Sequence, residues 1–143
     1  MNSKEIINYL PYGESFLFVD EITDVSSHGI TGNYTFSTNS FFYKGHFKNN
    51  PVTPGVILTE VMAQIGVVCL GIYLLADKLK EAAPQIALTS HKMDFFHAVF
   101  PGEKIVVSSE KQYFRFNKLK CFVQAYNEQG QLVCRGEIAG MIT

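Results

Sequence analysis

The chain has 143 residues, of which 47% are hydrophobic and 17% charged, and its formal net charge is −1. This length suits one folded domain with an apolar core, so we expect residues 1–143 to form a single domain. A nearly neutral chain offers no basic stripe to phosphate groups, which excludes nucleic-acid binding. Low charge together with twelve Phe and seven Tyr predicts a functional apolar surface, used by an oligomer interface or by an oily ligand.

The cysteines and the N-terminal residues bear on the compartment. Cys69, Cys121 and Cys134 are odd in number and lack metal-ligand spacing, so we expect buried, reduced packing residues. Residues 1–5 lack the charged-then-apolar pattern of an export signal. Both features favour a cytoplasmic protein.

The first third of the chain is predicted to hold a short helix and two strands. Residues 3–10 have a helical apolar face, and a proline ends that helix. Residues 16–22 are rich in aromatic and β-branched side chains, and residues 30–36 alternate apolar with polar positions, so both are expected to be strands. Residues 38–50 read as a loop.

A long apolar helix is predicted from Pro54 to the charged stretch at residues 77–81. Thr53 stands where an N-cap belongs, and Pro54 at the first helical position lacks only an N–H that would be unpaired anyway. Residues 56–76 could cross a bilayer by length, but they contain the ionisable Glu60 and form a single such segment, so we expect no membrane span.

After the helix the apolar period returns to two, which predicts strands at residues 85–89, 103–113, 120–126 and 131–142. Turns are expected at residues 117–118 and 127–130. A helix that is apolar on all sides needs cover on all sides, and a curved antiparallel sheet of five to seven strands supplies it. The expected class is therefore α+β, with the sheet wrapped around a long central helix.

Candidate catalytic residues surround the start of this helix. His46 lies in a Gly-, Asn- and Pro-rich loop, and histidine titrates in the range that suits a general base. Glu60, about two turns into the helix, has apolar neighbours, so burial should raise its pKa and make it a proton donor. The backbone N–H groups of Gly55 and Val56 lack intrahelical partners and can hold an anion. Gln64, one turn after Glu60, can hydrogen-bond the carboxyl and orient it.

A base, a neutral acid and an anion-binding helix start suit one kind of reaction. The base removes a proton α to a carbonyl, the helix start stabilises the enolate oxygen, and the acid assists departure of a β-hydroxyl. The other histidines have no such partners in sequence: His28 is expected in a turn, and His91 and His97 at the surface or rim.

These residues resemble the motif of the hot-dog-fold 3-hydroxyacyl-[acyl-carrier-protein] dehydratases of fatty-acid synthesis. That family shows Gly-His-Phe-Pro-x-x-Pro, then Pro-Gly-Val, then Glu-Ala-x-Ala-Gln, where this chain has residues 45–51, 54–56 and 60–64. Residues 10–20 and 99–103 agree as well, so the resemblance spans most of the chain.

The resemblance implies a hot-dog fold with His46 as base, Glu60 as acid and the Gly55 N–H as donor to the thioester oxygen. It implies a homodimer, or a trimer of dimers, in which the histidine of one subunit meets the glutamate of the other beside an acyl tunnel. The implied reaction converts 3-hydroxyacyl thioesters on acyl carrier protein to trans-2-enoyl thioesters without a metal or redox cofactor.

Four residues depart from the family pattern. Lys48 replaces a proline, which is expected to loosen the loop of the histidine. Phe96 and His97 stand where relatives carry arginines, which weakens the expected basic landing patch for an acidic carrier protein. Ile86 stands at the usual place of an aromatic gating residue. These changes leave His46 and Glu60 in place. They make a polyketide or aryl-polyene type pathway an alternative to fatty-acid synthesis.

Two other functions compete with the dehydratase. A hot-dog thioesterase would share the fold and the thioester handle, but such enzymes usually lack a histidine loop paired with a helix glutamate at this spacing. A non-catalytic acyl-binding subunit would have no use for a buried ionisable group, which is costly to bury. The retained pair of His46 and Glu60 therefore favours the dehydratase.

Overall fold

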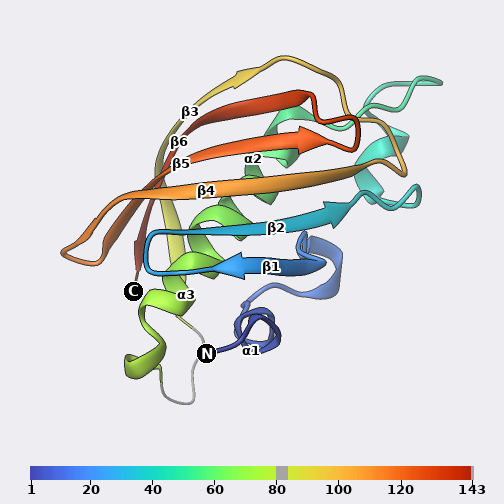
Figure 1. The fold of residues 1–143 in the computed structure, drawn as a ribbon. Helices are drawn as coiled ribbons and strands as arrows, with labels where there is room; N and C mark the ends of the chain where they lie inside the picture. The colour runs from blue at the N-terminus through green and yellow to red at the C-terminus, as the bar shows by residue number, and fades with distance from the viewer. Residues whose placement is uncertain (80–83, 143) are drawn as a thin grey trace.

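The structure, a computed structural model, describes residues 1–79 and 84–142. In those residues a six-stranded antiparallel sheet with the order β1-β2-β4-β5-β6-β3 curves around one long helix (Figure 1). This is the α+β arrangement of the predicted hot-dog fold. The strands are β1 (Glu21–Val25), β2 (Gly29–Thr35), β3 (Ile86–Phe95), β4 (Lys104–Arg115), β5 (Lys118–Asn127) and β6 (Leu132–Ile142).

The central helix runs from Gly55 to Leu74. It consists of α2 (Gly55–Ala63), a π-helical segment η3 (Gln64–Cys69) and α3 (Leu70–Leu74), and η3 packs against four strands of the sheet. By length and composition alone this helix could cross a membrane, but 78% of its most apolar window is buried inside the protein. It is therefore the core helix of the fold, as the sequence predicted.

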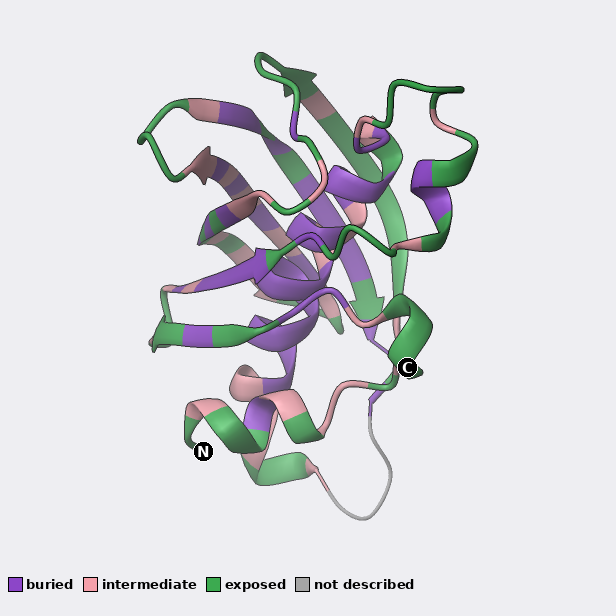
Figure 2. Ribbon diagram, turned by 90° about the vertical axis from the view of Figure 1, so that its right-hand side faces the viewer, coloured by how far each residue is buried: buried purple, intermediate pink, exposed green. Residues whose placement is uncertain are grey.

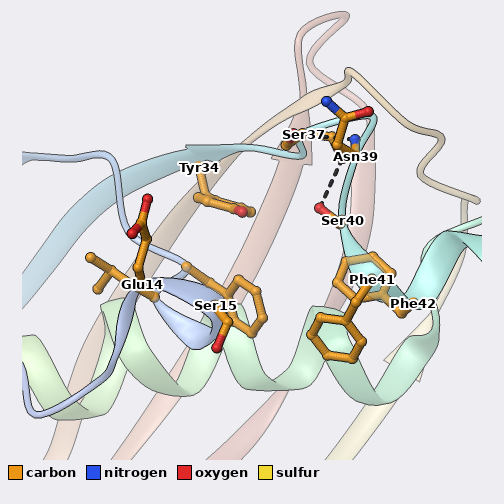
Figure 3. A pocket seen from close by; sticks show the side chains of 10 residues that line it. Glu14, Ser15, Tyr34, Ser37, Asn39, Ser40, Phe41 and Phe42 are labelled. Carbon is orange, nitrogen blue, oxygen red and sulfur yellow. Dashed lines mark hydrogen bonds between the residues drawn. The ribbon is translucent and has the colours of Figure 1, made fainter.

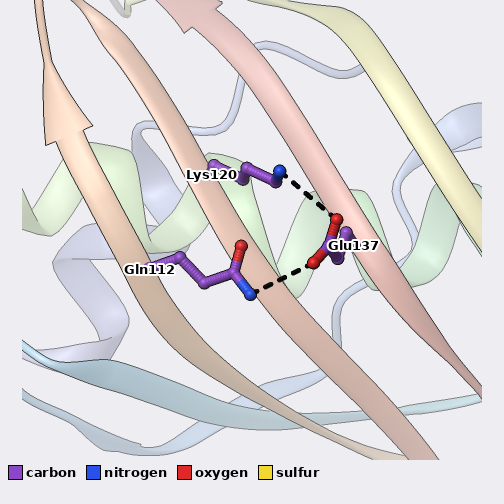
Figure 4. Close-up of polar contacts among 3 residues, drawn as sticks. All are labelled: Gln112, Lys120 and Glu137. Carbon is purple, nitrogen blue, oxygen red and sulfur yellow. Dashed lines mark hydrogen bonds and ion pairs between the residues drawn. The ribbon is translucent and has the colours of Figure 1, made fainter.

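The two faces of the sheet differ in polarity because side chains alternate along each strand. On β5 every second residue from Leu119 to Ala125 is buried against the helix. On the opposite face Lys120 Nζ lies 3.3 Å from Glu137 Oε2, and Gln112 Nε2 donates to Glu137 Oε1 at 3.4 Å (Figure 4). This polar cluster faces away from the helix and is a solvated surface.

Near the N-terminus the helix prediction is confirmed and the first strand prediction is wrong. Helix α1 (Ser3–Asn8) is capped by the Asn2 side chain, which accepts a hydrogen bond from the Glu5 N–H at 2.9 Å. The predicted strand at residues 16–22 is replaced by a 3-10 turn, η1 (Glu14–Phe16), and an extended segment, and β1 begins only at Glu21.

The reason for this difference is a side chain far away in sequence. Gln64 Nε2 donates to the Phe16 carbonyl at 2.9 Å, and Gln64 Oε1 accepts from the Phe18 N–H at 2.8 Å. The backbone from Phe16 to Phe18 is therefore paired with a side chain of the central helix, and pairing with β2 begins only at Asp20, whose N–H donates to the Asn33 carbonyl at 2.9 Å. Its aromatic and β-branched residues pack on the core without joining the sheet.

Both ends of the central helix differ from the prediction in detail. Pro54, with ψ of 140°, is the N-cap and Gly55 the first helical residue, so the assignment of Thr53 as cap is wrong by one position. The Thr53 hydroxyl bonds the Tyr43 hydroxyl instead. At the other end a 3-10 turn, η4 (Ala76–Lys78), follows the helix, and the predicted end at residues 80–81 lies outside the described residues.

The second half of the sheet follows the prediction except at two places. Strand β3 continues to Phe95, well beyond the expected residue 89, because as an exposed edge strand it lacks the alternation that marks a half-buried one (Figure 2). The β4–β5 turn is centred on Phe116 and Asn117, one residue early, both with positive φ. The turn at residues 127–130 is confirmed by a 3.0 Å bond from the Gly130 N–H to the Asn127 carbonyl.

The remaining expectations for single residues hold. All three cysteines are free and buried, as predicted. His28 lies in the turn between β1 and β2, where its N–H donates to the Ser26 hydroxyl at 3.1 Å. His91 and His97 are exposed.

Candidate active site

The loop that carries His46 is closed by its own backbone. It follows a 3-10 turn, η2 (Phe41–Lys44), and Phe47 and Asn50 exchange a reciprocal pair of hydrogen bonds of 3.1 Å each. The Val52 N–H then donates to the His46 carbonyl at 2.8 Å. Three main-chain hydrogen bonds therefore close the loop that contains Lys48.

The orientation of His46 fixes its tautomer. Its Nδ1 lies 2.9 Å from the Val52 carbonyl oxygen. A carbonyl oxygen can only accept, so Nδ1 must carry the proton of the neutral ring, and Nε2 keeps its lone pair. This is the state that a general base requires, and a main-chain carbonyl enforces it.

The start of the central helix lies beside this base. His46 and Gly55 line one hollow of about 330 Å³. Pro54 accepts from Ile57 and Leu58, while the N–H groups of Gly55 and Val56 have no acceptor among residues 1–79 and 84–142. Gly55 lines the hollow, whereas Val56 does not and is 77% exposed, so the Gly55 N–H is the better candidate for holding an anion there.

Glu60 is held by a residue of the same helix. Its Oε2 accepts a 2.9 Å hydrogen bond from Nε2 of Gln64, whose side chain is 0% exposed. Burial raises the pKa of Glu60 above its ordinary value, and the Gln64 bond acts in the opposite, weaker sense. The carboxyl is therefore oriented, and it keeps its proton to higher pH than an exposed glutamate.

A second hollow, of about 210 Å³, surrounds Glu60 and is otherwise almost entirely apolar. Tyr12, which the sequence analysis did not single out, is its other polar residue. Burial and the charge of Glu60 raise the pKa of the Tyr12 phenol, so it stays a neutral donor. An apolar wall with one acid suits an acyl chain. The wall consists of Phe16, Ala63, Val67, Val68, Ile86, Leu88, Ile138 and Gly140.

The structure thus brings the five candidate residues together as two groups. His46 lies with Gly55 and Val56 at the helix start, and Glu60 lies with Gln64. The two groups line different hollows of the chain. Of the four hollows described for residues 1–79 and 84–142, none is lined by both the candidate base and the candidate acid.

A larger hollow, of about 700 Å³, contains none of these residues (Figure 3). It lies between η1 and η2 and is open to solvent, with Glu14 on one side and Phe41 and Phe42 on the other. Phe42 and Tyr34 each pack edge-on against Phe18 on its inner side. These rings support the turn that precedes His46, so the hollow's wall has a structural role.

The departures from the family motif fall around both hollows. Phe96 and His97 line the hollow of His46, and Ile86 lines that of Glu60. The Arg135 guanidinium lies 5.4 Å from the centre of the Phe96 ring, so a cation from β6 stands beside this hollow. Among residues 1–79 and 84–142, no group of three or more His, Cys, Asp or Glu could hold a metal ion.

Solved structures share this fold at low sequence identity. The dehydratase heterocomplex ApeI:P from Xenorhabdus doucetiae superposes with a TM-score of 0.81 at 13% identity, covering 96% of this chain and 90% of that one. A hypothetical thioesterase from Streptococcus pneumoniae, solved with coenzyme A, has a TM-score of 0.62 at 13% identity, with coverages of 86% and 84%. At such identities the two structures support the fold alone.

Sequence relatives decide the family. Residues 10–139 match a family described as the FabA-like domain. The chain is 33% identical over 138 residues to the 3-hydroxyacyl-[acyl-carrier-protein] dehydratase FabZ of Caldicellulosiruptor bescii, covering 96% of this chain and 95% of that protein. It is 31% identical over 138 residues to FabZ of Chlamydia pneumoniae, with coverages of 95% and 88%. The chain therefore belongs to the FabA-like family.

Proposed function

We propose that this protein dehydrates 3-hydroxyacyl thioesters carried on acyl carrier protein to trans-2-enoyl thioesters. The observation that carries this function is the Val52 carbonyl at Nδ1 of His46, which leaves Nε2 as a base beside the unpaired N–H of Gly55. The FabZ dehydratases among the relatives confirm the sequence-based prediction of a dehydratase. The Glu60 carboxyl, whose pKa burial raises, is the acid that elimination needs.

The proposed reaction needs three groups and no cofactor. Nε2 of His46 takes the proton from the carbon next to the thioester carbonyl, while the Gly55 N–H stabilises the enolate oxygen. Glu60 gives its proton to the 3-hydroxyl, which leaves as water as the double bond forms. One proton is then on His46 and one is missing from Glu60, and transfer through solvent resets the pair.

We also propose that two copies of the chain share each site. Since His46 and Glu60 line separate hollows of one chain, the His46 loop of a second copy would complete the hollow of Glu60. Apolar side chains left half exposed beside these hollows, Leu88, Phe95 and Phe96, support a homodimer through this face. A trimer of such dimers stays a prediction. The Xenorhabdus dehydratase that shares this fold is itself described as a heterocomplex.

The proposed function also implies a domain organisation, a compartment and a pathway. One domain spanning residues 1–143 would act in the cytoplasm, in fatty-acid synthesis or in a polyketide or aryl-polyene type pathway. The small hollow at Glu60, closed by apolar residues that include Ile86, would accept the first part of the acyl chain.

Mass spectrometry of carrier-bound 3-hydroxyacyl thioesters tests this function. We expect wild type to remove and add water reversibly, and both His46→Ala and Glu60→Gln to abolish this. Release of free acid without dehydration would instead identify a thioesterase. Failure of wild type to convert short, medium or aromatic acyl chains would leave the acyl-binding subunit as the remaining function.

A further inference from the structure

A buried hydrogen bond joins two side chains that the catalytic chemistry does not use. The hydroxyl oxygens of Tyr43 and Thr53 lie 2.5 Å apart, and the two residues are only 6% and 5% exposed. Tyr43 is in η2, where its ring packs edge-on against Phe42 at 4.6 Å between centroids. The Thr53 N–H donates to the Val99 carbonyl at 2.8 Å, which ties it to the chain after β3.

The position of this bond relates it to the candidate base. Tyr43 lies three residues before His46, and Thr53 lies two residues before Gly55. The bond therefore closes the segment between them, within which His46 and Val52 already exchange the contacts that fix the imidazole. One hydroxyl pair thus connects the loop of the base to the start of the helix that would hold the substrate oxygen.

Stability alone gives little reason for a polar pair at this place. Replacing both partners of a buried hydrogen bond by apolar groups of the same shape is often nearly neutral, so a Phe and a Val could fill the same space. A hydrogen bond differs from such packing because it fixes a distance and a direction. Burial raises the pKa of Tyr43, so the phenol stays neutral and the bond is present across the working pH range.

We propose that Tyr43 and Thr53 are positioning residues that hold Nε2 of His46 and the N–H of Gly55 at a fixed separation. The inference rests on the proposed function, because only a reaction that uses both groups on one substrate needs their separation fixed. Near-attack geometry tolerates little error, and a misplacement of about 1 Å can cost about a hundredfold in rate.

The test compares Tyr43→Phe, Thr53→Val and the double variant with wild type. We expect each single variant to lower kcat about tenfold with little change in KM, since the groups stay present but lose their fixed geometry. The double variant should lose about the same factor as either single variant, because the one shared bond is lost only once. Thr53→Ser keeps the hydroxyl and should restore most of kcat.

Tyr34→Phe is the matched control, because it keeps the ring of β2 packed on Phe18 and removes only a hydroxyl that lines the open hollow of about 700 Å³ and has no hydrogen-bond partner in the described residues. It should leave kcat unchanged. Unchanged kcat in Tyr43→Phe, or losses that multiply in the double variant, would overturn the proposal. Losses of kcat that are fully explained by a lower Tm of the variants would also overturn it.

A readout besides activity separates this inference from the proposed function. In ¹⁵N NMR spectra the His46 ring of wild type should show a protonated Nδ1, and Tyr43→Phe should shift that ring toward a mixture of tautomers. A wild-type protein without dehydratase activity would contradict the proposed function. The NMR comparison would still decide whether Tyr43 and Thr53 position His46. Identical His46 signals in wild type and Tyr43→Phe would contradict the positioning role.

Discussion

The candidate acid and the candidate base stand in two different kinds of structure. Glu60 is on the central helix, and its partner Gln64 is fully buried and holds two backbone groups of the N-terminal segment as well. His46 is on a loop, and its ring is held by a main-chain carbonyl of that loop. The core of the fold thus holds the acid in position, whereas a surface loop holds the base in position.

This difference explains how one chain can prepare two groups with opposite tasks. The core desolvates the carboxyl and raises the pKa of Glu60, so the acid keeps its proton to higher pH than an exposed glutamate does. The loop leaves Nε2 of His46 open toward a hollow that contains no carboxylate.

The largest expected effect comes from removing either group. His46→Ala and Glu60→Gln should each lower kcat about 10²–10⁴-fold, the usual contribution of general acid–base groups. Rates measured with carrier-bound substrate under saturating conditions check this. Lys120→Met, which alters only the solvated cluster on the outer face of the sheet, is the control and should retain full activity. Substantial turnover by Glu60→Gln would show that Glu60 is not the general acid.

Next in size is the loss of the support for the acid. Gln64→Met keeps the volume but removes the partner of Glu60 and leaves the Phe16 carbonyl and the Phe18 N–H unpaired. Unsatisfied buried groups cost about 1–3 kcal/mol each, so the two groups predict a loss of about 2–6 kcal/mol in the free energy of unfolding. Urea denaturation measures it.

The matched control for that change is Gln112→Met. Gln112 is exposed and its side chain donates a single 3.4 Å bond on the outer face of the sheet, so this variant should unfold at nearly the wild-type urea concentration. Equal losses of unfolding free energy in the two variants would show that the Gln64 hydrogen bonds add no more stability than the exposed Gln112 bond. The claim that the core holds Glu60 in place through Gln64 would then be wrong.

A smaller effect is expected in the pH dependence of stability. Because the pKa of Glu60 is raised on folding, the folded protein binds the proton more tightly than the unfolded chain. Stability should therefore fall as pH rises from the unfolded pKa of Glu60 to its folded pKa. Glu60→Gln should lose this slope and melt a few degrees above wild type at pH 8. Parallel Tm–pH curves for the two proteins would contradict the raised pKa.

Much of the fold could be predicted from the sequence because its main elements are strongly patterned. The apolar run after Pro54 predicts a buried helix, and the alternation of buried and exposed residues in β4, β5 and β6 predicts a sheet that covers it. Residues 16–22 could not be placed in this way, because a strand and an extended segment paired with a side chain have the same composition. Only the distant Gln64 distinguishes them, and nothing in the local sequence shows that contact.

The residues of the candidate site could be proposed from the sequence, and the family resemblance implied that base and acid come from different subunits, but the hollows that hold them could not be predicted. The spacing of His46, Gly55 and Glu60 follows a motif, and each has the environment that its proposed role needs. That the chain places base and acid in separate hollows depends on tertiary packing. Tyr43 was missed because a tyrosine after two phenylalanines reads as packing, and because Thr53 fits an N-cap pattern that the structure does not use.

Mixing two inactive variants tests the shared site most directly. His46→Ala and Glu60→Gln chains, dissociated and reassembled together in equal amounts, should form mixed dimers in which one site takes His46 from one chain and Glu60 from the other. Random pairing then restores about a quarter of wild-type activity, since half the dimers are mixed and each has one intact site. A mixture no more active than its two parents, with exchange of chains verified by native mass spectrometry, would contradict a site completed by the second copy.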